Sequence, residues 1–545
     1  MADFDSQCSW HWLQLKSFCF RVAFTALLLI LGQFIVQLPR DCRSILPKHP
    51  MLNVMNIGRE HSYGTFNLRY ILGKFITGYK QKFGRFPNMC KIGINIDGVS
   101  PFRSSQFCFW TMLIKISKLK VSGVFPVSIA YGRGKPPTLE WLTDGLQQIQ
   151  NLCSEGFLNT SFQISHICAD LPAKNYILCT TSFHTLLSPC EKCLATGTRV
   201  DNKTIIKFRA RPFPARTDAD FRGLTANNLH TEDGPSPLTI FQELDMVQDV
   251  VIDPMHMLFL GVTKTIMKAL ASGRGSIRKL SNPALTVINQ RMKKFSESVP
   301  RGTFERPLRP FIDHERYKAS ELRCFILYAV IYVFRTLDQN LYCHLLHLAL
   351  GIRILDDETL LTSHGDYAHK LLVYFLKQCS ELYGDGILTI NFHNLSHIYQ
   401  DVKRHGKLSD ISAFPYESFN ICYGKFLRAR KYPVVEFHNR YMDMVHTNLF
   451  MFERKFVKQT FYLVDSKLES LYCTVSKRIY TVCEPYFCVE GIDSRLFHIK
   501  QFPKDNSRVV SDEEEAFLLQ NNNRECISID DGDKYVAIPL CHSNN

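Results

Sequence analysis

Apolar and polar residues alternate along four segments in the first third of the chain. In CKIGINIDG, Cys90, Ile92, Ile94 and Ile96 alternate with small or polar residues, and this period of two predicts a strand that ends at Asp97. The same reasoning predicts three further strands, at FCFWTMLIKI (107–116), VFPVSIAYG (124–132) and SFQISHICAD (161–170).

Residue patterns typical of helices follow the third and fourth of these segments. Leucines and isoleucines recur every three or four residues between 139 and 152, which predicts a helix. LPAKNYILCTTSFH (171–184) predicts a second helix, with Pro172 in its first turn. The succession strand, strand, strand, helix, strand, helix is typical of an α/β core.

The rest of the chain divides by its pattern into a helical part and a β part. Long apolar faces in IDPMHMLFLGVTKTIMKAL, ASELRCFILYAVIYVF and NLYCHLLHLALGIRIL predict helices. Short alternating runs such as RIYTVCEPYFCV predict a small β unit after residue 440, with KYVAIPLC as a last strand. SDEEE and QNNNRE predict solvated loops.

One apolar run near the N-terminus leaves three interpretations open. VAFTALLLILGQFIVQL (22–38) has 17 residues and lies between Arg21 and Arg40. A membrane span needs about 20 apolar residues and at least about 17, and a signal-peptide core is also compatible. Gln33 and Gln37 on one helical face, and the stop at Pro39, favour a buried helix.

Composition narrows the class of protein. The 545 residues are 46% hydrophobic and 12% aromatic, which excludes a disordered chain and predicts several domains. The net charge of +14 favours an anionic partner, with nucleic acid as the leading candidate. The 19 cysteines are scattered through apolar runs, as expected of reduced thiols.

Three carboxylates are candidates for chemistry. Asp97 and Asp170 end the first and fourth predicted strands, and they meet at one sheet edge if those strands are neighbours. Two hard oxygen ligands there suit Mg²⁺ or Mn²⁺, although both residues can equally be ordinary turn residues. Glu417 in SAFPYESFN is either a catalytic group or a surface charge at a helix start.

Cysteines and histidines form a second candidate set. Cys190 and Cys193 make a C-x2-C pair, and His393 and His397 make an H-x3-H pair on one helical face. Taken alone, both pairs can be coincidental. Their spacing favours a shared site, because Asp170 precedes Cys190 by 20 residues and Glu417 follows His397 by 20.

Seven motifs in order resemble one family. They are LPRDCRSIL, INIDGVSPFRSS, CADLPAK, CEKC, DPMHMLFLGV, RYKASELRCFILY and NFHNLSHIYQDVKRHGKLSDISAFPYESFN, spanning roughly residues 20 to 430. The chain resembles the CACTA-type DDE transposases, relatives of the catalytic subunit of the antibody-gene recombinase. The resemblance implies an α/β, ribonuclease-H-like core interrupted by a large helical insertion. The expected divisions are an N-terminal helical segment (1–88), the first part of the core (89–195), the insertion (196–385), the returning core (386–440) and a C-terminal extension (441–545).

The resemblance also implies roles for the candidate residues. Asp97, Asp170 and Glu417 would hold two Mg²⁺ or Mn²⁺ ions, and Cys190, Cys193, His393 and His397 one structural Zn²⁺. One departure is that Ala169 stands where the family usually has cysteine, with Cys168 one residue earlier. For Asp253 and His256 of DPMH, a helix cap and a packed histidine are expected.

Two groups of basic residues are candidates for DNA contact, with a solvated linker as the alternative for the first group. They are Lys207, Arg209, Arg211, Arg216 and Arg222, in the segment that precedes the predicted helices of the insertion, and Lys425, Arg428, Arg430 and Lys431 near Glu417.

The expected function follows from the resemblance. It is an active or once-active nuclear transposase that cleaves and joins double-stranded DNA (transposon ends and target) as a homo-oligomer, without a small-molecule cofactor. The alternatives are a domesticated, catalytically silent DNA-binding protein or a membrane-anchored one. The family's apolar helix at the corresponding place favours residues 11–38 as a packed helix over a membrane anchor. An additional N-terminal DNA-binding segment, common in relatives, is not expected here.

Overall fold

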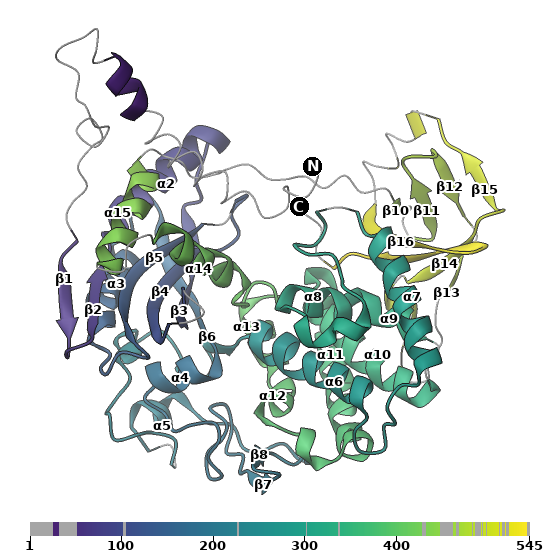
Figure 1. The fold of residues 1–545 in the computed structure, drawn as a ribbon, viewed down its shortest axis with the longest axis horizontal. Coiled ribbons are helices and arrows are strands. Elements are labelled where there is room, and N and C mark those ends of the chain that lie inside the picture. The colour runs from purple at the N-terminus through teal and green to yellow at the C-terminus, as the bar shows by residue number, and fades with distance from the viewer. Residues whose placement is uncertain are drawn as a thin grey trace. The chain divides into compact units, whose positions relative to one another are not determined.

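The computed structural model describes residues 25–31, 52–101, 105–121, 123–225, 228–300, 302–335, 338–427, 432–446 and, with short gaps, 461–541. These residues form a mixed α/β structure with a central mixed sheet and many helices (Figure 1). The chain forms two compact units. The first comprises residues up to Leu194, Pro214–Asp253 and Asp410–Arg454, and the second comprises Ala195–Phe213, Pro254–Ser409 and Lys455–Asn545.

A seven-stranded sheet organises the first unit. Its strand order is β1-β2-β5-β4-β3-β6-β9. Antiparallel pairing joins β3, β4, β5, β2 and β1, whereas β6 is parallel to β3 and β9 is parallel to β6. The strands are β1 (Val54–Ile57), β2 (His61–Thr65), β3 (Met89–Val99), β4 (Phe107–Ile116), β5 (Val124–Arg133), β6 (Ser161–Ala169) and β9 (Val250–Ile252). The four strands predicted from alternation are therefore confirmed.

Helices cover both faces of this sheet because each of its faces carries apolar side chains. Met112 of β4 contacts α3 (Thr143–Glu155), and Phe125 of β5 contacts Phe75 of α2 (Leu68–Phe83) on the same face. On the opposite face Phe109 of β4 packs against Tyr423 of α14 (Phe414–Phe426) and against α15 (Pro433–His446). The sheet therefore lies between two helical layers.

Three predictions for the first unit are corrected. The segment 1–88 is not wholly helical, since β1 and β2 extend the sheet. The helix predicted over 171–184 ends early: α4 runs from Leu171 to Ile177, and Cys179 has a positive φ of 52° that a helix does not continue through. Of the predicted packed helix 11–38, the described part, 25–31, is helical, but Leu29 and Ile30 are 52% and 56% exposed.

No helix within the described ranges has the length and apolar character required to cross a bilayer.

The second unit combines helices with a C-terminal sheet. Its helices are α6 (Lys264–Ser272), α7 (Asn282–Ser298), α8 (Ala319–Cys324), α9 (Val330–Val333), α10 (Gln339–Leu355), α11 (Glu358–Tyr383), α12 (Ile390–His393) and α13 (Ile398–His405). Two π-helical segments, Met255–Thr263 and Phe325–Ala329, precede α6 and α9. The three helical stretches predicted from apolar faces are confirmed. His393 and His397 belong to this unit and not, as predicted, to the returning core with Glu417.

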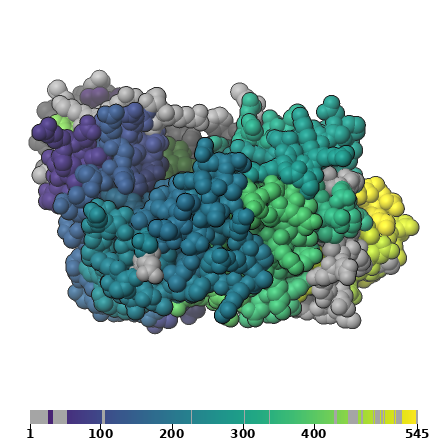
Figure 2. Space-filling view, turned by 90° about the horizontal axis from the view of Figure 1, so that it is seen from below, coloured from purple at the N-terminus to yellow at the C-terminus, as the bar shows by residue number. Residues whose placement is uncertain are grey.

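The C-terminal sheet is larger than predicted. Eight antiparallel strands lie between Phe461 and Pro539, in the order β13-β14-β17-β16-β10-β11-β12-β15. Arg524, predicted in a loop, begins β16 (Arg524–Asp531). Buried Arg353 of α10 donates to the carbonyl oxygen of Pro539 at 2.7 Å, joining sheet and helices. Figure 2 shows the yellow sheet residues beside the green helical ones.

Candidate active site and metal centre

Asp97 lies on β3, and Asp170 directly follows the neighbouring parallel strand, β6. In the β3–β6 register, Asn95 pairs with Cys168, so the next residues on the same face of each strand are Asp97 and Asp170. The condition set by the sequence, that the two strands be neighbours, is confirmed. Asp97 is 8% exposed and accepts the Gly98 N–H at 2.7 Å. Asp170 caps α4 by accepting the Ala173 N–H at 2.7 Å.

Glu417 lies in the first turn of a helix that crosses the same face. A Cβ atom on Gly93 would lie 2.7 Å from the Tyr416 hydroxyl, so the bare glycine allows α14 to approach β3. Near the other end of α14, Gly424 faces the carbonyl oxygen of Pro101. Gly93 and Asp97 point to one face of β3, so α14 passes over the face that carries Asp97. Pro415 near the helix start and an acidic residue in the first turn both favour helix formation there.

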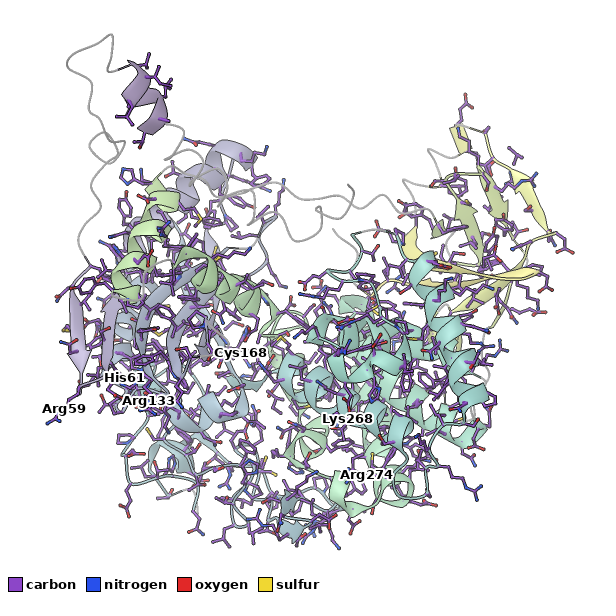
Figure 3. All side chains as sticks on the ribbon, in the orientation of Figure 1. Arg59, His61, Arg133, Cys168, Lys268 and Arg274 are labelled. Carbon is purple, nitrogen blue, oxygen red and sulfur yellow. The ribbon has the colours of Figure 1, made fainter. Side chains whose placement is uncertain are left out.

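A buried polar layer surrounds this face. Cys168 lies inside the sheet (Figure 3), and burial raises the pKa of its thiol well above the usual value. Lys115, opposite Gly93 on β4, donates to the carbonyl oxygen of Asp410 at 3.4 Å, and burial lowers the pKa of its ammonium group. Asp253 accepts the N–H of Ala413. Asp253 therefore contacts the start of α14, a partner 160 residues away that its place before the next helix did not predict.

The cysteine pair sits in a tight loop held by Arg216. The Lys192 N–H points at the Cys190 sulfur at 3.3 Å. Buried Arg216 donates to the Cys190 carbonyl oxygen at 3.0 Å and to the Ser188 hydroxyl at 2.7 Å. The Arg216 guanidinium interacts electrostatically with both cysteines, and the thiolate is the form of cysteine that binds metals.

The histidine pair is presented by a helical turn. His393 and His397 face each other with their Nε2 atoms 3.1 Å apart. Tetrahedral coordination with Zn–N bonds of about 2.0 Å places two imidazole nitrogens roughly 3.3 Å apart. His393 also contacts the Phe213 ring edge-on, with centroids 5.9 Å apart.

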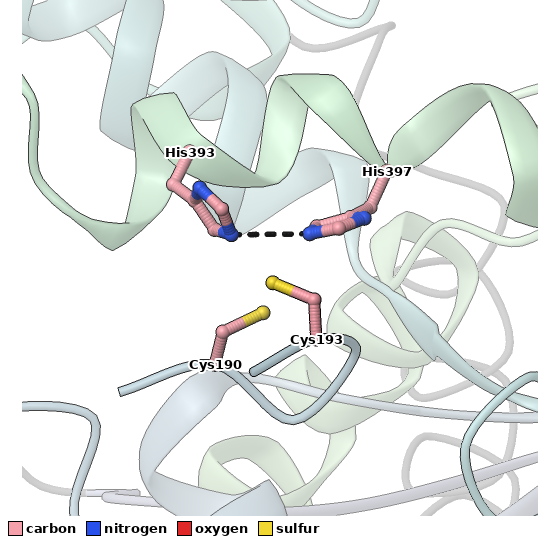
Figure 4. A group of neighbouring side chains, drawn as sticks. All are labelled: Cys190, Cys193, His393 and His397. Atoms are coloured by element: carbon pink, nitrogen blue, oxygen red, sulfur yellow. Dashed lines mark hydrogen bonds between the residues drawn. The ribbon is translucent and has the colours of Figure 1, made fainter. Parts of the chain in front are cut away.

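The ligand atoms of Cys190, Cys193, His393 and His397 all lie within 4.8 Å of one another (Figure 4). In Figure 4 both sulfurs and both rings point toward one common space. Two thiolates and two imidazoles form the donor set of a closed tetrahedral zinc site, so these residues fit that ion. Across the described part of the chain this is the one such group of three or more Cys, His, Asp or Glu, and Asp97, Asp170 and Glu417 do not form a second.

The candidate DNA contacts separate into structural and exposed residues. Arg216 is buried at the cysteine loop, and Arg222 donates to the carbonyl oxygens of Phe241 and Leu244, so both are removed from the predicted set. Their backbone acceptors could not be seen in the sequence. Lys425 on α14 is half-buried, and Arg428, Arg430 and Lys431 lie outside the described residues.

Three exposed cations remain in the first predicted group. Lys207 pairs with Asp385 at 3.1 Å, and the Arg209 guanidinium lies 4.7 Å from the centre of the Phe213 ring. Arg211 is exposed.

One exposed cation beside α4 was not predicted. Exposed Lys135 lies 5.1 Å from the ring of Tyr176, in the short helix that Asp170 caps. It belongs to the loop RGKPP after β5, and a basic loop at a strand end was the signal available in the sequence.

Neither a protein-family model nor a curated protein matches the chain.

Proposed function

We propose that the protein is a DDE-type DNA transposase of the CACTA-like group, acting in the nucleus on double-stranded DNA as a homo-oligomer. The observation that carries this proposal is the placement of Asp97, Asp170 and α14 with Glu417 on one face of the sheet. Those three carboxylates offer the hard oxygen donors that Mg²⁺ or Mn²⁺ prefers.

The strand order supports a ribonuclease-H-like core. Three antiparallel strands (β3, β4, β5) are followed by β6 and β9, which lie parallel to β3 on its other side. The first four of these strands are those predicted from the alternation of apolar residues, and the adjacency of β3 and β6 supports a shared site for Asp97 and Asp170.

In phosphoryl transfer, the three carboxylates would hold metal ions and a nearby lysine would bind the substrate. When bound, two divalent ions supply activation of a water or 3′ hydroxyl and stabilise charge at phosphorus. Asp97 and Asp170 each accept a hydrogen bond from a main-chain N–H, which fixes the position of one carboxylate oxygen in each side chain. Glu417 completes the set from α14, and exposed Lys135 lies near α4, where it can bind a phosphate of the substrate backbone.

One observation keeps a second candidate open, a silent DNA-binding protein. Among the described residues, the three carboxylates do not form a group close enough to share an ion. Mutually repelling carboxylates approach more closely once cations neutralise them, so the spacing fits either function.

The test is Mn²⁺-dependent nicking of a duplex that carries the terminal sequences flanking the gene. Wild-type protein should nick it, and Asp97→Asn and Asp170→Asn should not, while all three bind the duplex alike. Binding without nicking by the wild-type protein would establish the silent binder instead.

A further inference from the structure

Positive charge is concentrated in one part of the sequence that the candidate site does not account for. Between His61 and Leu139 the chain carries twelve Lys and Arg residues, and Asp97 is the single acidic residue. The whole chain has 65 basic and 51 acidic residues, so this stretch supplies most of its net charge of +14.

Three segments of this stretch meet at one end of the sheet. They are the last turn of α2, the first residues of β3 and the connection from β4 to β5. The Ser117 N–H donates to the Lys91 carbonyl oxygen at 2.9 Å, and the Lys120 N–H donates to the Tyr79 hydroxyl at 3.1 Å. The Lys120 ammonium group also lies 5.5 Å from the centre of the Phe83 ring.

Six exposed cationic side chains surround these contacts, and we name them the cationic end: Lys80, Lys82, Arg85, Lys91, Lys118 and Lys120. Basic residues in a last helical turn stabilise the helix dipole, which accounts for Lys80 and Lys82. That effect does not account for the four others, which lie on a loop, a strand and a turn. Burial of apolar surface does not explain them either, because their side chains are exposed.

The cationic end is far from the carboxylates. Lys91 and Asp97 are six residues apart on β3, which corresponds to roughly 20 Å along an extended strand. That separation is about the width of a DNA duplex, so a duplex on the cationic end and another with a phosphate at Asp97 can lie side by side without overlapping.

We propose that the cationic end binds a second segment of duplex DNA through its phosphates, without reading its sequence. The proposal rests on the proposed function in one respect, the choice of DNA as the polyanion. Lysine and arginine side chains bind phosphate oxygens and release counterions, which supplies sequence-independent affinity. A membrane surface fits less well, because an interfacial membrane site adds a broad apolar face to its cations. At this end Met89 is the large apolar side chain that is mostly exposed, at 58%, within the described residues.

The experiment compares two fourfold variants with the same change of charge. The first carries Lys80→Gln, Lys82→Gln, Lys118→Gln and Lys120→Gln. The control carries four exposed lysines of the second unit changed to glutamine: Lys268 (labelled in Figure 3), Lys293, Lys370 and Lys377. Fluorescence anisotropy gives the dissociation constant for a short duplex that lacks the element's ends, between about 50 and 200 mM salt.

Each lost phosphate contact should make the log–log salt slope shallower by about 0.9, so loss of all four should change the slope by about 3.6 and weaken binding more than tenfold. The salt slope of the control should differ from the wild-type slope by no more than about 0.9, the value for one phosphate contact. Thermal melts establish that both variants fold. In the wild-type protein, bound duplex should also protect Lys118 and Lys120 from acetylation, a readout that needs no variant.

Several results would overturn the proposal. Equal loss of slope in both variants would mean that net charge alone drives binding. Acetylation of Lys118 and Lys120 in the presence of duplex, as fast as in its absence, would mean that the duplex binds elsewhere. If the first variant lost binding to anionic lipid vesicles but bound duplex like the wild-type protein, the surface would be a membrane-binding one. Glu417→Gln should keep the wild-type salt slope of duplex binding. If that variant still nicks DNA, the proposed function is contradicted, but the inference about the cationic end is not.

Discussion

The carboxylate of Asp253 accepts a hydrogen bond from the main-chain N–H of Ala413 at 2.9 Å, joining residues 160 positions apart in the chain. Both residues are buried, at 3% and 1% exposure. Ala413 immediately precedes α14, and its carbonyl oxygen accepts the Glu417 N–H at 3.0 Å. The chain leaves the first unit after Asp253 and returns to it at Asp410. Asp253 therefore fixes the start of the helix that carries Glu417.

Replacing Asp253 should lower the nicking rate by shifting Glu417, although Asp253 would take no direct part in the reaction. Asp253→Ala leaves the buried Ala413 N–H without its acceptor, at a cost of about 1 to 3 kcal/mol, and allows the helix start to shift. Asp253→Asn keeps a side-chain oxygen that can accept the same bond, so it should recover most of the nicking rate that the alanine variant loses. Nicking assays beside thermal melts make the comparison. If the asparagine variant is as inactive as the alanine variant and both fold, Asp253 binds metal directly and is not a positioning residue.

Glu417→Gln should abolish nicking while leaving folding and DNA binding unchanged. The substitution keeps the size of the side chain but removes the charge that would hold an ion. Loss of such a group costs on the order of 3 kcal/mol in the transition state, about a hundredfold in rate. The double variant with Asp97→Asn should be little worse, because residues acting as one unit are not additive.

Glu140→Gln, an exposed glutamate of the same unit, is the matched control for Glu417→Gln. It should nick at the wild-type rate. Wild-type-like nicking by a folded Glu417→Gln protein would leave Glu417 as a charge at a helix start.

Zinc should be present in equal amount with the protein and should stabilise it. Cys193→Ser and His397→Ala each remove one ligand of the four, so both should lose zinc and melt at a lower temperature. Cys343→Ser, at a half-buried cysteine outside the group, is the control and should retain the metal. Metal content by mass spectrometry decides this prediction. A zinc-free wild-type protein with an unchanged melt would contradict it.

Two arginines from one predicted DNA-binding segment should behave differently. Arg216→Ala removes a buried guanidinium with hydrogen bonds to the cysteine loop, so it should lower the free energy of unfolding by about 2 kcal/mol or more. Arg211→Ala, at an exposed position, should leave stability unchanged and make the salt slope of DNA binding shallower by about 0.9. Urea titrations and anisotropy separate the two effects. Equal stability of both variants would contradict the structural role of Arg216.

Sequence reasoning succeeded where one residue pattern determines one element. The alternation of Ile92, Ile94 and Ile96 predicted β3 correctly, and the C-x2-C and H-x3-H spacings identified the four residues that the structure brings together. It failed where tertiary contacts decide. Arg216 and Arg222 resemble surface cations in the sequence, but each is held by backbone carbonyl oxygens contributed by other segments.

The acceptor of the Ala413 N–H could not be predicted either. The residues that face each other across a 160-residue separation are set by the fold and not by local pattern. The short strands β1 and β2 were missed for a related reason, since they gain their stability by pairing with the edge of a sheet formed elsewhere in the chain.

Acid should destabilise the second unit through a buried histidine. His344 of α10 is fully buried and stacks on Phe375 of α11, with ring centroids 4.3 Å apart. Its Nδ1 lies 3.2 Å from the side-chain oxygen of Gln378. Burial, chiefly, lowers the pKa of His344 from 6.5 to about 4, and nearby His347 adds a smaller effect in the same direction.

The unfolded chain therefore binds a proton at His344 between about pH 6.5 and 4, where the folded chain does not. Stability is unaffected above this window and falls as the pH drops through it, by up to about 3 kcal/mol. His344→Gln should flatten that part of the pH profile of the free energy of unfolding, measured by urea titration. His364→Gln, at a half-buried histidine of α11, is the control for loss of an imidazole. A profile as steep in His344→Gln as in the wild-type protein would assign the acid sensitivity to other groups.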